Sequence, residues 1–128
     1  MKKYLRIIFG MVLAAALLCT TAVAVEARWS NVASIGPSIS ANDGCYLSVV
    51  NGLSGTTKID CTLILYEKGW FGSYTEVART SGVYYGPSHE FAGYYDIKSG
   101  TTYKLTTQAT VTRNGVDEYV EYSFEKKC

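Results

Sequence analysis

The sequence predicts an all-β protein, a single seven-stranded antiparallel β-sandwich that follows an export signal. After residue 27 the chain alternates apolar and polar residues and is rich in Thr, Tyr, Val and Ile, which is typical of half-buried strands. Clusters of Gly, Asn, Asp and Ser separate these alternating runs, as turns do. No stretch has a convincing helical period. These observations together favour an all-β fold of one domain.

The predicted strands follow one another with a turn signal between neighbours. The turn Asn42-Asp43-Gly44 separates the first two runs, and a turn at Lys68-Gly69 separates the third run from the fourth. The third run places Ile59, Cys61, Leu63 and Leu65 on one face, because side chains alternate along a strand. The predicted strands are residues 29–39, 45–50, 57–67, 74–79, 89–97, 103–113 and 116–126.

The last two runs predict a hairpin with a defined register. Asn114-Gly115 favours a type I′ turn, since both central residues of that turn need positive φ. A two-residue loop pairs Arg113 with Val116. One face of the hairpin is then mostly apolar and the other polar, as a sheet with one buried face requires. The predicted pairs on the apolar face are Leu105 with Phe124, Thr107 with Tyr122, and Ala109 with Val120.

The first 27 residues have the pattern of a secretory signal peptide. Three basic residues among the first six precede an apolar run at residues 7–18, and small residues follow. The run is shorter than the roughly 20 apolar residues that a membrane span needs. We expect cleavage after Ala27, with Ala24 as the alternative. The prediction is a signal peptide at 1–27 and a secreted β-sandwich domain at 28–128.

The charge balance limits the classes of partner. The whole chain has 12 basic and 11 acidic residues, and beyond Lys126-Lys127 the basic residues of the expected domain do not cluster. Nucleic-acid binding needs a dense basic surface, so no nucleic-acid partner is expected. The same balance argues against strong attraction to an anionic membrane. No stable membrane insertion is expected after signal cleavage.

The segment Ile97–Leu105 resembles a sequence pattern of a known family. It reads Ile-Lys-Ser-Gly-Thr-Thr-Tyr-Lys-Leu and resembles the fibronectin type III pattern of a leucine, two residues, Gly-Thr, one residue, a tyrosine, one residue and an aliphatic. The resemblance implies an immunoglobulin-like sandwich in which Tyr103 forms a tyrosine corner, with its hydroxyl bonded to backbone a few residues upstream. The alternative is an ordinary tyrosine at the edge of the core.

The chain is also similar to small exported Firmicutes proteins that contain such a domain. The similarity rests on Ala27-Arg28-Trp29, on Gly55-Thr56-Thr57-Lys58-Ile59 and on the stretch from Gly100 to Leu105. It implies a fold and a compartment, and it implies no activity.

Three cysteines follow the predicted signal, and exported proteins keep disulfides. In a seven-strand sandwich of this order the second strand begins, and the seventh ends, at the same end of the domain. We therefore favour a Cys45–Cys128 bridge, with Cys61 as a buried free thiol. The alternative is Cys45–Cys61, which would follow if the second and third strands formed a simple hairpin.

The residues of a catalytic or metal site are sparse. Ser88-His89-Glu90 contains a nucleophile, a base and an acid, but neighbours on a strand point to opposite faces. His89 is the only histidine, and a structural zinc site needs four ligands. We expect no enzyme activity, no metal and no cofactor.

Aromatic residues in loops are the positive sign of a binding function. Trp70-Phe71 falls in a predicted hairpin loop, and Tyr84-Tyr85 precedes Gly86-Pro87. Exposed Trp and Tyr are frequent binding anchors. The alternative is that Tyr84 and Tyr85 place one ring on each face of the sheet and that Trp70 packs against a sheet edge.

The sequence favours a secreted, non-enzymatic interaction or structural module with a protein, peptide or glycan ligand. The alternative is a small secreted effector, either antibacterial or protease-inhibitor-like. An inhibitor would use a rigid exposed loop, for which residues 82–87 are the candidate.

Overall fold

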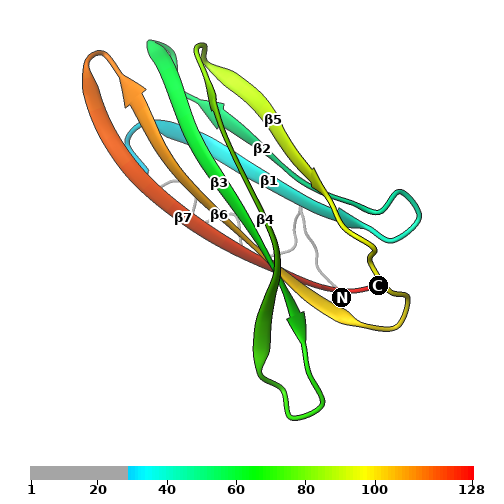
Figure 1. Ribbon diagram of the computed structural model, residues 1–128. Coiled ribbons are helices and arrows are strands. Elements are labelled where there is room, and N and C mark those ends of the chain that lie inside the picture. The colour runs from blue at the N-terminus through cyan, green and yellow to red at the C-terminus, as the bar shows by residue number, and fades with distance from the viewer. Residues whose placement is uncertain (1–28) are drawn as a thin grey trace. The chain divides into compact units, whose positions relative to one another are not determined.

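The computed structural model describes residues 29–128, which form seven strands in two antiparallel sheets (Figure 1). The predicted all-β sandwich is confirmed, and no helix occurs in this range. The predicted signal peptide at 1–27 lies outside the described residues. Residues Ser34–Cys128 form one compact unit. The strands are β1 (Val32–Ser40), β2 (Cys45–Gly52), β3 (Thr56–Lys68), β4 (Tyr74–Tyr84), β5 (Ser88–Tyr94), β6 (Thr102–Arg113) and β7 (Val116–Lys127).

The two sheets divide the strands in a way that sequence order does not reveal. One sheet has the order β1-β2-β5 and the other has the order β4-β3-β6-β7. The strands β2 and β3 are neighbours in sequence but lie in different sheets. The chain crosses again between β4 and β5, and once more between β5 and β6.

The β6–β7 hairpin has the predicted register. Asn114 and Gly115 have φ values of 51° and 78°, as a type I′ turn requires. Arg113 pairs with Val116, and Leu105 pairs with Phe124. The turn and the apolar alternation therefore specify the same pairing.

The core lies on the inner faces of the two sheets. The alternate residues of β3 predicted to share a face, from Ile59 to Leu65, are almost wholly buried. One polar contact joins the sheets inside this core: the Thr107 hydroxyl donates to Ser48 Oγ at 2.9 Å, and both residues are buried. A buried hydroxyl without a partner costs stability, and this pair satisfies both hydroxyls.

Three strands have an end that differs from the prediction by three residues or more. β1 begins at Val32, three residues after the predicted start. β4 continues to Tyr84, which pairs with Ile59 on β3, so the first half of the predicted 82–87 loop is strand. Its inward positions are Ala78, Thr80 and Gly82, whose small or polar side chains hide the apolar alternation. β5 instead ends at Tyr94, before the predicted end of the fifth strand at residue 97.

The expected Cys45–Cys128 bridge is not formed in the structure. All three cysteines of residues 29–128 are free thiols. The end of β7, just before Cys128, does meet the end of β1, which precedes Cys45 in the chain, because Lys126 Nζ donates to the Ile39 carbonyl at 2.7 Å. Cys45, however, alternates with the buried residues of β2, so its side chain lies on the outer face of its sheet.

The alternative Cys45–Cys61 bridge is wrong for a topological reason. Cys45 pairs with Tyr94 on β5, whereas Cys61 pairs with Ala109 on β6, in the other sheet. Cys61 is buried among apolar neighbours, as predicted for a free core thiol. Burial, with a smaller contribution from Asp60, raises the pKa of this thiol to about 12.

Candidate functional site

The tip of the β3–β4 hairpin carries the most exposed aromatic residues in the described part of the chain. The turn between Lys68 and Tyr74 is closed by two backbone hydrogen bonds, Gly69 N–H to Ser73 O at 2.8 Å and Gly72 N–H to Gly69 O at 3.1 Å. Gly72 has a φ of 83°, a conformation that side-chain-bearing residues rarely adopt. Glycine at this position therefore lets the chain reverse tightly.

Trp70 and Phe71 occupy this tip, and both side chains are fully exposed, at 101% and 100%. The alternative in which Trp70 folds onto an edge is wrong. The last residue of β3 that pairs with β6 is Glu67, so the turn extends beyond the end of its sheet. Figure 1 shows this hairpin, in green, running past its neighbours. The two aromatic side chains form a convex apolar projection, here called the aromatic tip (Trp70 and Phe71).

The base of this hairpin is braced from the outer face of the four-stranded sheet. The Tyr74 hydroxyl donates to Glu125 Oε2 on β7 at 2.6 Å. Lys104 Nζ lies 4.7 Å from the centre of the Tyr74 ring and 4.9 Å from that of Tyr66, within cation–π range. Burial, followed by the hydrogen bond to Glu125, raises the pKa of Tyr74 to about 12. These contacts hold the hairpin in a defined direction.

Acidic groups near the tip are paired. Glu67 lies 3.8 Å from Lys98 Nζ. Glu76 accepts two hydrogen bonds from Arg79, and these lower the pKa of its carboxyl group. Lys68 is the only charged residue in the sequence between Glu67 and Glu76. The tip therefore combines two apolar rings with one adjacent positive charge.

Tyr84 and Tyr85 have different surroundings from the tip residues. The Tyr84 ring stacks on His89 with centroids 4.1 Å apart, and His89 meets Phe91 edge-on at 4.9 Å. These rings bridge β4 and β5, where the chain changes sheet. Tyr85 is 75% exposed, with Lys58 Nζ 6.0 Å from its ring centre. Tyr84 thus helps to close the sandwich edge, and Tyr85 remains an exposed ring.

The four predicted binding aromatics do not form one patch. Tyr74 pairs with Lys68 at one end of the β3–β4 ladder, and Tyr84 pairs with Ile59 at the other end. At about 3.3 Å per residue, the length of β4 separates the two pairs by roughly 30 Å. The aromatic tip is therefore a separate site from Tyr84-Tyr85.

Tyr103 makes the contact predicted from the fibronectin type III resemblance. Its side chain is wholly buried, and its hydroxyl accepts a hydrogen bond from the Lys98 backbone N–H at 2.9 Å. Gly100, with a φ of 84°, lies in the turn between them. Burial is the largest cause of the raised pKa of Tyr103. This residue fastens the loop before β6 and takes no part in the exposed site.

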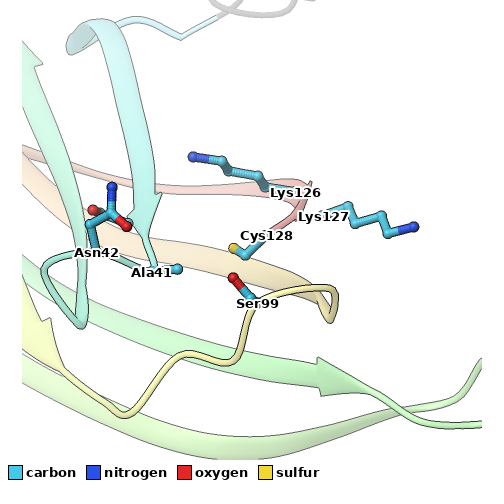
Figure 2. A pocket seen from close by; sticks show the side chains of 7 residues that line it. Ala41, Asn42, Ser99, Lys126, Lys127 and Cys128 are labelled. Atoms are coloured by element: carbon cyan, nitrogen blue, oxygen red, sulfur yellow. The ribbon is translucent and has the colours of Figure 1, made fainter.

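A shallow polar pocket of about 230 Å³ lies at the end of the domain where β1 and β7 finish (Figure 2). Cys128 and Ser99 both line it, and the Lys127 side chain points away from them (Figure 2). The Lys126 side chain extends to β1, where its Nζ donates to the Ile39 carbonyl. Three separate segments build the pocket, so no sequence motif marks it. Its lining residues are Ser40, Ala41, Asn42, Ser99, Lys126, Lys127 and Cys128.

The structure also locates the residues considered for catalysis. Ser88, His89 and Glu90 are consecutive on β5, and the His89 ring packs between Tyr84 and Phe91. Within residues 29–128, no three His, Cys, Asp or Glu side chains gather closely enough to hold a metal ion. The same residues contain no helix long and apolar enough to cross a membrane. No protein-family model matches the chain, and a search of curated proteins finds no relative.

Proposed function

We propose that this protein is a secreted, non-enzymatic interaction module whose contact element is the aromatic tip. The pattern of residues 1–27 supports secretion. The observation that carries the binding function is the full exposure of Trp70 and Phe71 at the end of a braced hairpin. Burying a large apolar side chain contributes about 1.5–3 kcal/mol, and these two side chains leave that contribution available to a partner.

The alternative of an inhibitor-like effector has less support. It relied on a rigid exposed loop at residues 82–87, but β4 continues to Tyr84 and β5 begins at Ser88. Three residues remain for the connection, and the Tyr84 ring is engaged with His89. The interaction module therefore remains the first proposal, with the protein, peptide and glycan classes expected from the sequence as its starting ligands.

A comparison of variants on isolated surfaces tests this function. The wild-type protein, a Trp70→Ala/Phe71→Ala variant and a Tyr85→Ala control are measured on cell-envelope fractions, mucins, glycan arrays and lipid vesicles. We expect the wild type and the control to bind one of these with equal affinity. The double variant should lose about tenfold or more, the equivalent of one buried aromatic side chain.

Two results would contradict the proposal. One is binding that the double variant retains in full. The other is turnover of a substrate by the purified protein, which would show an enzyme.

A further inference from the structure

We infer that the aromatic tip docks shallowly and reversibly on a phospholipid bilayer, with Trp70 and Phe71 entering the interface and Lys68 remaining among the headgroups. The inference rests on the proposed function, because it names the partner of the same tip. It differs from the partner classes that the sequence suggests, and the reasons are the shape, area and charge of the tip.

The apolar area of the tip is too small for a stable protein interface by itself. Two aromatic side chains offer roughly 300–500 Å², whereas a specific protein interface buries about 800 Å² on each partner. Protein hot spots also lie inside a ring of contacts that exclude water. Here the neighbours are Gly69, Gly72 and Ser73, which provide no such ring. A lipid bilayer needs neither this area nor this ring of contacts, because it is fluid and only the two side chains have to enter it.

The charges around the tip suit the headgroup layer. Trp is enriched at membrane–water interfaces, and lysine can bury its stem while its ammonium group stays hydrated. Lys68 directly precedes the turn. The carboxylates nearest in sequence, Glu67 and Glu76, face Lys98 and Arg79 and so present little net negative charge to the lipid phosphates.

The contacts at the hairpin base favour docking over deep insertion. The Tyr74–Glu125 hydrogen bond and the Lys104 contacts keep the polar outer face of the sheet behind the tip. Penetration therefore stops at the turn. We expect an anchor of two residues to bind the bilayer weakly, as a single acyl chain does with an association constant of about 10⁴ M⁻¹. Because apolar burial dominates, binding should depend little on anionic lipid or on salt.

Depth-resolved fluorescence of Trp70 tests the inference on the full chain. The chain has two tryptophans, so Trp29→Phe leaves Trp70 as the only one, and Trp70→Phe leaves Trp29 as the matched control. The probes are vesicles of phosphatidylcholine alone and vesicles of phosphatidylcholine with phosphatidylglycerol, at low and high salt. Some vesicles carry lipids brominated at defined depths.

We expect Trp70 emission to shift to shorter wavelength and to be quenched most by bromines near the headgroup end. Partition coefficients in the neutral and mixed vesicles should agree within about fivefold, the effect of about 1 kcal/mol from one lysine, because only Lys68 adds charge at the tip. Phe71→Ala should lower the partition coefficient by about tenfold or more, and Tyr85→Ala should leave it unchanged. The readout at Trp70 is local, so vesicle binding by residues 1–27 alone does not imitate it.

An unshifted and unquenched Trp70 at saturating vesicle concentration overturns the inference. If the Trp70→Ala/Phe71→Ala variant loses protein or glycan binding while Trp70 of the Trp29→Phe protein stays unquenched by vesicles, the proposed function is kept and the bilayer is rejected. If the double variant binds every surface as the wild type does, both proposals fail.

Discussion

At the scale of single residues, buried side chains with hydrogen-bonded hydroxyls differ in role from exposed aromatic side chains. Tyr103, Ser48 and Thr107 are wholly buried, and each hydroxyl has a hydrogen-bond partner. Trp70 and Phe71 are large aromatic residues like Tyr103 but extend into solvent. Burial thus separates side chains that hold the fold from side chains available to a partner.

Replacing Tyr103 with Phe should lower the free energy of unfolding by about 1–2 kcal/mol. The substitution keeps the buried ring but removes the acceptor of the Lys98 N–H, and an unpaired polar group in a part-buried place costs about that much. Urea unfolding of the two proteins measures the difference. An unchanged midpoint would show that the hydroxyl contributes nothing.

The three thiols should differ in reactivity. Cys61 is almost wholly buried and its pKa is raised to about 12, so little thiolate forms at neutral pH. Cys45 and Cys128 are half-exposed. Site-resolved alkylation of the native protein should label Cys61 last, and denaturation should abolish the difference. A linked Cys45–Cys128 peptide in a non-reducing digest would contradict the free thiols of the structure.

At the scale of elements, the β3–β4 hairpin has a stabilising base and an exposed tip. Its base contacts β6 and β7 through Tyr66, Tyr74 and Lys104. Its tip is joined to the sheet by its own turn hydrogen bonds. The two parts should therefore respond differently to substitution.

Trp70→Ala should change the free energy of unfolding by less than about 0.5 kcal/mol, as is usual for exposed positions. The reason is that the Trp70 side chain is fully exposed. Thermal unfolding of the variant beside the wild type provides the measurement. A loss of several kcal/mol, the scale of a truncated core aromatic, would show that Trp70 packs against the domain.

For the whole molecule, tyrosines link stability to alkaline pH. The pKa values of Tyr46, Tyr74, Tyr103 and Tyr119 are raised, and burial is the largest cause for the first three. For Tyr119 the largest cause is the hydrogen bond to Glu121. A phenol whose pKa is higher in the folded state favours folding while it is neutral. That contribution is complete below the unfolded pKa of about 10 and is lost as pH rises through the folded value.

We therefore expect the unfolding midpoint to fall between about pH 10 and pH 12, the upper limit being the pKa of Tyr74. Tyr74→Phe should make this fall smaller, because the raised phenol and its bond to Glu125 are removed. Chemical denaturation at a series of pH values measures both proteins. A flat profile through this range would contradict the linkage.

Local patterns in the sequence were sufficient for the number and order of the strands and for one register, but not for the ends of β4 and β5. Alternation of apolar side chains marks β2, β3, β6 and β7, because that period follows from strand geometry. The Asn114-Gly115 turn specifies the β6–β7 pairing, because a two-residue loop leaves one register. The tyrosine corner at Tyr103 was expected from the fibronectin type III resemblance, and the structure identifies its partner as the Lys98 backbone N–H.

Contacts between distant segments were decided only by the tertiary structure. The sequence left β2 and β3 free to form a hairpin, and their placement in different sheets separates Cys45 from Cys61. It marked four loop aromatics without showing that β4 keeps two of them far from the other two. The sequence by itself determined local conformation, because periodicity and turn chemistry act over a few residues. The assignment of strands to sheets, the polar pocket and the isolation of the aromatic tip depend on which distant strands pair.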